Sequence, residues 1–261
     1  MENVNEILNN YYSSYDEDAR LTKDRAHHVE FITTVKYIDK YLKNGDKILE
    51  VGAGTGRYSL YYASKGYEVN SVELIQSNID VFKTKIKDNM NIKVEQGNAL
   101  DLSRFDDNTF DCTLVLGPLY HLFSKEDKEK AINEAIRVTK KGGIVYLAYI
   151  TNDAVILSYG LRKGNLLRIP ELVDENYKVK DIPEEIFSVN LVDEFNSLME
   201  SFDVEFMHNV ATDGISNHLA EYVNKLSDKE YDIWVDYHLK TAERKDLLGH
   251  SSHILYICKK N

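Results

Sequence analysis

Cysteine is scarce in this sequence, and its scarcity argues against two kinds of protein. Only two cysteines occur among 261 residues, Cys112 and Cys258, and each lies within an apolar run that is typical of a strand. A fold held by several disulfides, or a cysteine-rich metal site, needs more thiols than these. We therefore predict that both cysteines are buried packing residues.

Long apolar runs and an excess of positive charge are also missing. No apolar run approaches the roughly 18 residues that cross a bilayer, and the first residues, MENVNEILNN, lack the basic start and apolar centre of a signal peptide. The formal net charge is −11, which opposes contact with a phosphate backbone. These absences predict a cytoplasmic protein without a membrane partner, and they disfavour a nucleic-acid partner.

The residues that are present are typical of an α/β domain. An apolar content of 43% is enough to build a core, so long disordered stretches are not expected. Five apolar, strand-like runs alternate with helical patterns up to residue 150, which predicts a doubly wound parallel sheet with right-handed crossovers. The runs are KILEVGA, YEVNSVEL, NIKVEQG, FDCTLVLG and IVYLAYI.

Helix and cap signals complete this pattern. Because no repeat, linker or low-complexity tract is visible, residues 1–261 are predicted to form a single domain. Two further strands, DVEFMHNV and HILYICKK, are expected near the end of the chain. Helices are expected over 31–43, 77–87, 125–140 with Ser124 as its cap, 191–198, and twice within 213–249, where a capping box from Ser227 to Glu230 begins the second helix.

Three glycines stand close together directly after the first strand-like run. In EVGAGTGRYS they occupy Gly52, Gly54 and Gly56, and glycine inside ordered structure usually marks a tight turn or a close backbone contact. A dinucleotide-binding turn, G-x-G-x-x-G, would need its third glycine at position 57, which is Arg57. The observed pattern, E-x-G-x-G-x-G, instead resembles the class I S-adenosylmethionine-dependent methyltransferases.

This resemblance implies a fold, a cofactor and a set of cofactor-binding residues. The implied fold is a Rossmann-like doubly wound sheet, mostly parallel with an antiparallel last strand, with helical insertions after the fifth and sixth strands. The implied cofactor is S-adenosylmethionine, which leaves as S-adenosylhomocysteine. The implied binding residues are Glu50, Gly52, Ala53, Gly54 and Gly56 at the methionyl part, Glu73 and Leu74 after the second strand, Asn98, Ala99 and Leu100 at the adenine, and Leu116 and Gly117 after the fourth strand.

Two of these residues have plainer alternatives. Glu73 ends the second strand, where a carboxylate can accept hydrogen bonds from both ribose hydroxyls, but an acid at that place could also be a solvated strand end. Asn98 stands where the family bonds the adenine amino group. It could also be a turn residue that bonds its own backbone.

The acceptor side of the site is less defined by the sequence. Methyl transfer from a sulfonium depends mainly on alignment, so a general base is optional. The residues GPLY, at 117–120, replace the Asp or Asn, two prolines and aromatic residue of amino-methyltransferases, which argues against an adenine N6 or glutamine amide acceptor. Tyr120 and His121 are the nearest candidates for catalysis. Tyr120 could instead pack over the cofactor, and His121 could be a structural loop histidine.

Segments outside the motifs are expected to cover the site. Residues 1–30 form a predicted cap, while 151–200 and 213–249 are predicted helical lid segments around the acceptor. No metal site is predicted, because adjacent His27 and His28 point apart on a helix. In the cap, Tyr11, Tyr12 and Tyr15 could face the sulfonium. Arg20 or Arg25 could pair with the methionyl carboxylate. Near the other end of the chain, His250 and His253 could reach the same face of the sheet.

The function that these patterns favour is methyl transfer to a small molecule. An RNA or ribosome-component methyltransferase of the same fold is an alternative, against which the acidic balance weighs. A cofactor-binding sensor or scaffold without turnover is a second alternative, since no catalytic base is obvious. A dehydrogenase is disfavoured by Arg57. The acceptor, the methylated atom and the oligomeric state do not follow from the sequence.

Overall fold

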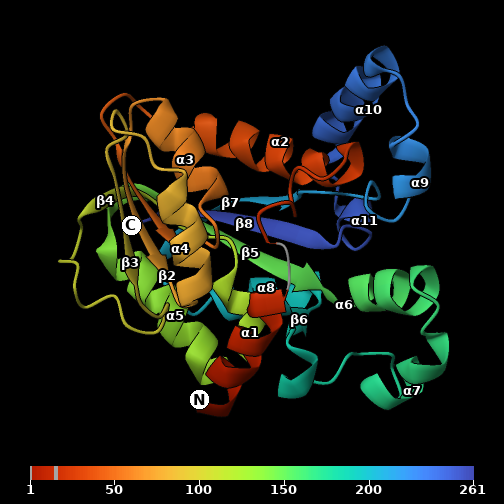
Figure 1. Ribbon diagram of the computed structural model, residues 1–261. Helices are drawn as coiled ribbons and strands as arrows, with labels where there is room; N and C mark the ends of the chain where they lie inside the picture. The colour runs from red at the N-terminus through yellow and green to blue at the C-terminus, as the bar shows by residue number, and fades with distance from the viewer. Residues whose placement is uncertain (1, 15–16) are drawn as a thin grey trace.

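An eight-stranded sheet forms the centre of the computed structural model, which describes residues 2–14 and 17–261 (Figure 1). The strands are β1 (Lys47–Val51), β2 (Glu68–Glu73), β3 (Ile92–Gln96), β4 (Phe110–Val115), β5 (Thr139–Thr151), β6 (Val189–Asn190), β7 (Val204–Ala211) and β8 (His253–Lys260). Their order is β3-β2-β1-β4-β5-β8-β7, and β6 pairs with the end of β5. Strands β1 to β5 run parallel, whereas β8 is antiparallel to both β5 and β7. The predicted mixed sheet with an antiparallel last strand is therefore confirmed.

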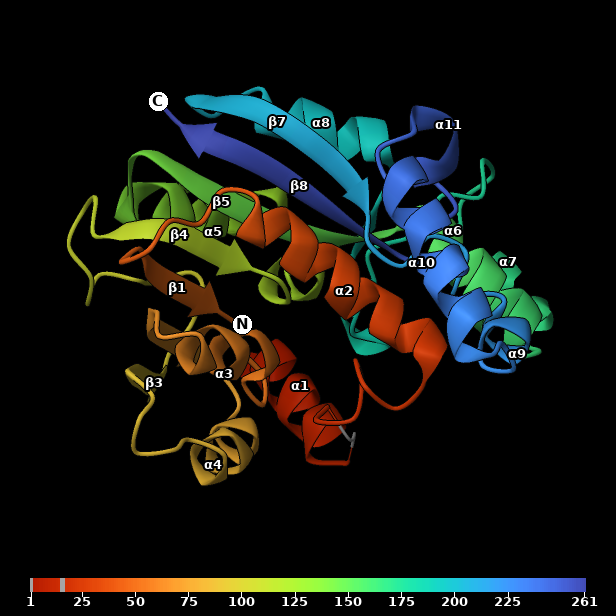
Figure 2. The same cartoon turned by 90° about the horizontal axis from the view of Figure 1, so that it is seen from above.

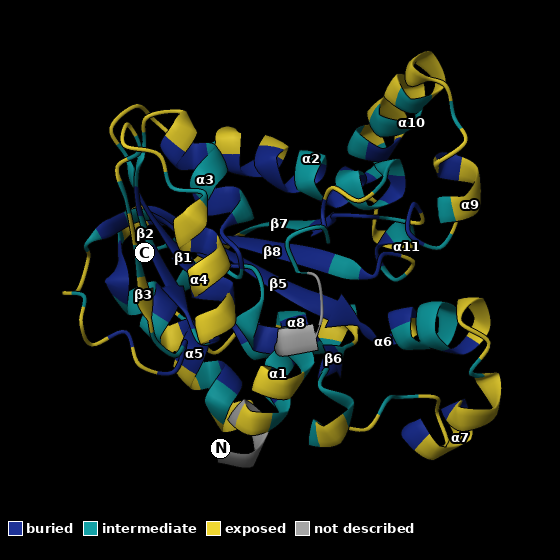
Figure 3. Ribbon diagram, viewed as in Figure 1, coloured by how far each residue is buried: buried dark blue, intermediate teal, exposed yellow. Residues whose placement is uncertain are grey.

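Alternate side chains of the central strands enter two separate cores. In β1, Ile48 packs on one face of the sheet, while Leu49 packs on the other. In β5, Tyr146 and Leu147 divide in the same way. Successive strand residues point to opposite faces, so a strand that helices cover on both faces is apolar almost throughout. Figure 3 shows these strands mostly buried, between helices whose outer sides are exposed.

Helices cover both faces of the sheet. The helix predicted over 31–43 spans Arg25–Asp39 instead, with Asp24 as its N-cap, and the helix predicted over 77–87 spans Gln76–Thr84. Ser124 caps α5 by accepting a hydrogen bond from Asp127 N, as predicted, although α5 ends two residues before the expected boundary at 140. On one face, Ile38 of α2 and Tyr62 of α3 are buried; on the other, Ile132 of α5 is buried. These helices are α2 (Arg25–Asp39), α3 (Arg57–Ser64), α4 (Gln76–Thr84) and α5 (Lys125–Val138).

The segment before α2 contains a helix that the sequence analysis did not predict. Helix α1 (Glu2–Ser14) packs against α4 and near the short helix η4 (Pro183–Glu185), so it lies over the carboxyl ends of the parallel strands (Figures 1 and 2). Among its described side chains, Leu8 is buried and Tyr11 and Tyr12 are half-buried, which is the i, i+3, i+4 spacing of one helix face within an otherwise polar sequence. Tyr15, one of the three predicted cap tyrosines, lies outside the described residues.

The predicted lid over 151–200 divides into two parts of different character. Residues 152–188 project from the end of β5 as short helices, whereas α8 (Val192–Met199) packs under the sheet, where the Phe195 ring stacks on Tyr149 at 4.1 Å between centroids (Figure 1). The lid predicted over 151–200 therefore extends too far, because α8 is part of the core and only residues 152–188 project. The projecting elements are α6 (Asn152–Ala154), the π-helix η2 (Val155–Arg162), η3 (Leu166–Arg168) and α7 (Ile169–Leu172).

The insertion between β7 and β8 forms a second projection. It contains α9 (Ala220–Val223), α10 (Asp228–Thr241) and α11 (Lys245–Leu248). Ser227 and Glu230 form the predicted capping box at the start of α10. Cys112 and Cys258 are buried free thiols, as predicted. Within the described part of the chain, every helix is too short or too polar to traverse a lipid bilayer.

Candidate cofactor site and adjoining cavity

The glycine turn between β1 and α3 is held in place by backbone hydrogen bonds. Gly52 N and Ala53 N both donate to Val72 O of β2, at 2.7 and 3.2 Å. Gly54 has φ +53°, a left-handed conformation, and a Cβ at this position would lie 3.4 Å from Glu17 Cγ. The turn therefore presents bare backbone to the space beneath the N-terminal segment.

Gly56 has a different role from the one predicted. A Cβ at Gly56 would lie 2.4 Å from Cε2 of the Phe82 ring in α4, and φ here is +85°. The residue is absent from the lining of the adjacent cavity. Gly56 thus permits close packing between the start of α3 and α4, and the structure places it away from the predicted cofactor contact.

A cavity of about 290 Å³ lies at the carboxyl ends of β1, β2, β3 and β4, and we call it the first cavity. This is the edge at which open α/β sheets bind ligands. Nearly all of the residues assigned from the sequence line it. They are Tyr12, Glu50, Gly52, Ala53, Gly54, Glu73, Leu74, Asn98, Ala99, Leu100, Leu116, Gly117, Tyr120 and His121.

Glu50 lies in the wall of the first cavity and anchors the start of α3. It accepts a hydrogen bond from Ser59 N at 2.9 Å and another from Ser59 Oγ, which also contacts Ser71 Oγ at 2.8 Å. Burial, reinforced by the charge of Glu73, raises the pKa of Glu50 to about 8. At neutral pH the carboxyl group is therefore mostly protonated.

Glu73 braces the glycine turn from the end of β2. Its Oε2 accepts from Gly54 N at 2.7 Å, and its Oε1 accepts from Ile75 N at 2.9 Å. Burial raises the pKa of Glu73, although these N–H donors oppose the shift. Asn98 also forms a turn, because its Oδ1 accepts from Leu100 N at 2.9 Å. Both residues also line the cavity. Their roles in the two turns are therefore compatible with the predicted contacts of Glu73 to the ribose and of Asn98 to the adenine.

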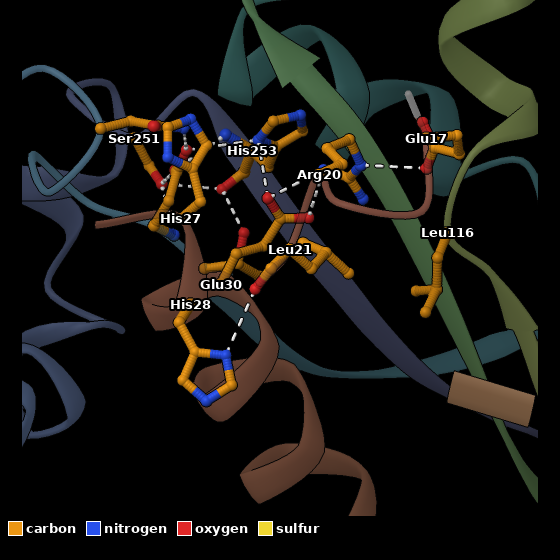
Figure 4. Close-up of polar contacts among 12 residues, drawn as sticks. Glu17, Arg20, Leu21, His27, His28, Glu30, Leu116, Ser251 and His253 are labelled. Atoms are coloured by element: carbon orange, nitrogen blue, oxygen red, sulfur yellow. Dashed lines mark hydrogen bonds and ion pairs between the residues drawn. The ribbon is translucent and has the colours of Figure 1, made fainter. Parts of the chain in front are cut away.

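Arg20, rather than Arg25, reaches the cavity. Its Nη1 donates to both carboxylate oxygens of Glu30 at 3.0 Å, and its Nε donates to Glu17 Oε1 at 3.2 Å, so the guanidinium lies between two acids (Figure 4). Arg25 points away: its Nη2 donates to Asp228, and its guanidinium lies 5.2 Å from the centre of the Tyr231 ring. The predicted cofactor contact of Arg25 is wrong, because its guanidinium binds Asp228 and Tyr231 of α10 instead.

His253 extends this network to the start of β8, where the sequence suggested that it could reach the site. Its Nδ1 lies 3.3 Å from Asp213 Oδ2 and 3.5 Å from Glu30 Oε2 (Figure 4). Burial lowers the pKa of His253, but the two carboxylates outweigh burial and raise it overall. Glu30, Asp213 and His253 are close enough to hold a metal ion, but the Arg20 guanidinium already neutralises Glu30 and would repel a cation. The cluster is therefore an internal ion network.

Adjacent His27 and His28 diverge, as expected. His27 Nδ1 bonds Asp24 Oδ1 at 2.7 Å, while His28 Nδ1 lies 3.2 Å from Leu21 O (Figure 4).

His121 connects α1 to the loop after β4. Its Nε2 lies 2.9 Å from Tyr12 Oη, and its Nδ1 lies 2.9 Å from Ile186 O. Burial lowers the pKa of His121 to about 4, so the ring is neutral near pH 7. Because a carbonyl oxygen only accepts, Nδ1 carries the proton and Nε2 accepts from the Tyr12 hydroxyl. Tyr120 donates to Leu116 O at 3.2 Å.

A second cavity, of about 670 Å³, adjoins the first one. Its walls come from the N-terminal segment, the π-helix η2, the segment before β6 and the start of β8. Four residues line both cavities and so mark the junction between them: Tyr12, Glu17, Arg20 and Tyr120. No sequence motif indicated this second cavity, because its walls come from segments far apart in the chain.

Comparisons with known proteins agree with this architecture. A family model described as a methyltransferase domain matches residues 49–147. A demethylmenaquinone methyltransferase of Paenarthrobacter aurescens is 32% identical over 127 residues, which are 49% of this chain and 47% of that protein. A glycine/sarcosine N-methyltransferase of Aphanothece halophytica is 25% identical over 182 residues, 66% of each chain. The matches thus span about half to two thirds of these relatives.

Solved structures share the fold over a larger part of the chain. A methyltransferase structure from Thermotoga maritima has a TM-score of 0.60 at 17% identity and covers 99% of this chain and 100% of its own. Another, from Methanosarcina mazei, has a TM-score of 0.56 at 20% identity and covers 86% of this chain and 96% of its own. The matched region, residues 49–147, contains the glycine turn and the strand ends that build the first cavity. Over that region the chain is similar to the methyltransferase domain family, and it shares its fold with solved S-adenosylmethionine-dependent methyltransferases.

Proposed function

We propose that the protein transfers the methyl group of S-adenosylmethionine to a small molecule bound in the second cavity. The observation that carries this proposal is the junction of the two cavities, where Tyr12 and Tyr120 line both. A cofactor in the first cavity and an acceptor in the second would meet there. Methyl transfer requires that the acceptor atom, the methyl carbon and the sulfur align with water excluded.

The residues of the first cavity fit this cofactor. The space that a Cβ at Gly54 would fill leaves room for the methionyl chain, and the buried Glu73 carboxylate has further lone pairs for the ribose hydroxyls. Asn98, Ala99 and Leu100 would surround the adenine. The Glu17 carboxylate lies beside the Arg20 guanidinium. The carboxylate suits the ammonium group of the methionyl end, and the guanidinium suits its carboxylate.

The chemistry supplied by the cofactor is an activated methyl group on a positively charged sulfur. With the cofactor bound, an electron pair of the acceptor would form the new bond to carbon, and the pair of the carbon–sulfur bond would stay on sulfur. The protein's part is to hold and align the two molecules. We assign His121 to the positioning of Tyr12, because both of its ring nitrogens are engaged. The expectation that His121 is a base is not supported by this geometry. Tyr120 lines the junction of the two cavities, and its hydroxyl donates to Leu116 O.

Several observations support a small acceptor over RNA. The second cavity is lined by α1, η2 and the segment before β6, and its volume lies in the ordinary range for small-molecule sites. The net charge of −11 opposes a polyanion. The relatives named above act, by their names, on demethylmenaquinone or on glycine and sarcosine. We further propose that residues 1–30 and 152–188 act as the lid over both cavities.

A direct experiment is to incubate the protein with a metabolite extract and methyl-deuterated S-adenosylmethionine, and to search by mass spectrometry for compounds that gain the labelled group. A labelled small molecule that depends on the protein would support the proposal. Tight binding of S-adenosylhomocysteine without any labelled product would favour the sensor alternative. Labelling of added RNA would favour the RNA alternative.

A further inference from the structure

The lining of the second cavity indicates what kind of acceptor it takes. Resting on the proposed function, we infer that the acceptor is an anionic amphiphile, with a compact apolar body and a carboxylate or phosphate group. The body would lie toward the junction with the first cavity, and the acidic group toward the end of η2.

One part of the cavity wall is a small apolar cluster, separate from the two main cores. Tyr120, Ile150, Ala154 and Val189 are its buried members, and Phe187 packs against them with its side chain half-buried. All five line the second cavity. A wall of this kind binds apolar surface through the hydrophobic effect and gives no partner to a small polar metabolite such as a free amino acid.

The other part of the wall has a surplus of positive charge. Lys23, Arg162, Lys163 and Lys180 line the cavity, and none of them has an ion pair with a carboxylate of the described residues. They come from three separate segments: the loop before α2, the end of η2 and the segment after α7. In a chain of net charge −11, such a group around one cavity favours an anionic ligand.

Each acid in the same wall already has an arginine as its partner. Glu17 and Glu30 both bond to Arg20, and Glu185 pairs with Arg168 at 2.9 Å. Asp213, behind the wall, is shared between Ser251 and His253. A cationic acceptor would therefore meet four cations that have no ion pair among the described residues, and carboxylates that already share a guanidinium.

Buried polar atoms without partners lie on the same side. Ser252 Oγ and Asn217 Oδ1 have no hydrogen-bond partner among the described residues, although the two residues are only 6% and 8% exposed, and both line the cavity. Arg162 Nη1 donates to Asn217 O at 2.8 Å, which places this cation beside them. Buried polar atoms are costly to leave unpaired. The Ser252 hydroxyl can donate to an anionic group of a ligand, whereas Asn217 Oδ1 only accepts and would need a donor.

The helix that carries Arg162 is itself unusual. η2 is an eight-residue π-helix, and Ser158 within it contacts His218 Nδ1 at 3.2 Å. π-Helical segments are rare and occur frequently at functional sites, because the wider turn redirects side chains. Here the π-helix places Val155 on the apolar part of the wall and Arg162 on the cationic part.

The test uses the full chain saturated with S-adenosylhomocysteine and three probes that share one apolar body: phenylhexanoate, phenylhexanol and phenylhexylamine. Calorimetry measures the affinity of each probe. We expect the acid to bind about tenfold more tightly than the alcohol or the amine, since charged contacts in a partly buried site add to apolar contact. Removing two cations in the Arg162→Gln, Lys163→Gln variant should abolish this preference and leave the alcohol affinity unchanged.

The matched control is the Lys87→Gln, Lys93→Gln variant, which removes the same charge from exposed sites outside both cavities. It should keep the preference for the acid. Equal affinities for the three probes, preference for the amine, or an effect of the control variant as large as that of the cavity variant would overturn the inference. The affinity for S-adenosylhomocysteine, measured in parallel, separates the two claims. A protein that does not bind S-adenosylhomocysteine contradicts the proposed function. A protein that binds it but does not prefer the acidic probe contradicts only the acceptor class.

Discussion

Tyr12 Oη lies 2.9 Å from His121 Nε2, although the two residues are 109 positions apart in the chain. This hydrogen bond joins α1 to the loop that follows β4, and Tyr12 lines both cavities. The N-terminal helix is thus attached to the sheet at the point where the cofactor and the acceptor are proposed to meet. Burial lowers the pKa of His121 to about 4, so at pH 7 the ring is neutral and its Nε2 accepts this hydrogen bond.

Replacing Tyr12 by Phe tests this attachment. The change keeps the ring and removes one buried hydrogen bond, so we expect S-adenosylhomocysteine affinity to fall by roughly fivefold, equivalent to about 1 kcal/mol. Calorimetry measures the effect. Tyr222→Phe, at an exposed tyrosine on α9, is the matched control and should bind as the wild type does. Wild-type affinity in the Tyr12 variant would show that α1 does not contribute to the cofactor site.

Glu73 is expected to bind the ribose of the cofactor. Glu73→Ala should weaken S-adenosylhomocysteine binding by about 1 to 3 kcal/mol, the usual scale for hydrogen bonds to a charged group. Glu73→Gln keeps an acceptor oxygen for either the Gly54 or the Ile75 N–H group but not for both, so it should also lose affinity. The control is Glu68→Ala at the other end of β2, where the side chain pairs with Lys47. If all three variants bind equally well, the ribose lies elsewhere.

Two glycines of the same motif should fail in different ways. Asparagine tolerates positive φ better than other residues, so Gly54→Asn should keep most of the stability but fill the space left for the methionyl chain and abolish cofactor binding. Gly56→Asn carries a similar backbone change but collides with Phe82, so it should lower the free energy of unfolding by about 1 to 3 kcal/mol. Urea unfolding and calorimetry on both variants measure the contrast. The reverse pattern would mean that the two roles are exchanged.

Glu50 predicts a pH dependence of stability. Its folded-state pKa is raised to about 8, so between the ordinary carboxyl pKa near 4.5 and pH 8 the folded protein holds a proton that the unfolded chain releases. The contribution of Glu50 to the free energy of unfolding therefore falls as pH rises through this window and levels off above pH 8. Glu50→Gln keeps the group neutral, so its stability should fall less steeply over the same range. Equal slopes for the two proteins, measured by urea unfolding, would contradict the raised pKa.

The sheet and most of the first cavity could be predicted because their signals are local. The run KILEV followed by three glycines specifies β1 and its turn, and Glu73 and Asn98 follow directly after their own strands. The carboxyl ends of parallel strands share one edge of the sheet, so residues at these ends meet without further information.

The errors arise where a role depends on distant contacts. Arg20 and Arg25 are equivalent in the sequence, and only the presence of Asp228 on α10 and Glu30 on α2 separates them. Gly56 looks like its neighbours until Phe82 of α4 packs against it. The second cavity has no motif at all, because tertiary packing alone brings its walls together.

The most direct test of the central claim is a crystal structure of the complex with S-adenosylhomocysteine. We predict the ribose hydroxyls at the Glu73 carboxylate, the methionyl chain along the backbone of Gly54, and the sulfur facing the junction beside Tyr12 and Tyr120. A complex in which the ligand lies outside the first cavity, or in which its sulfur faces away from the second cavity, would contradict the account.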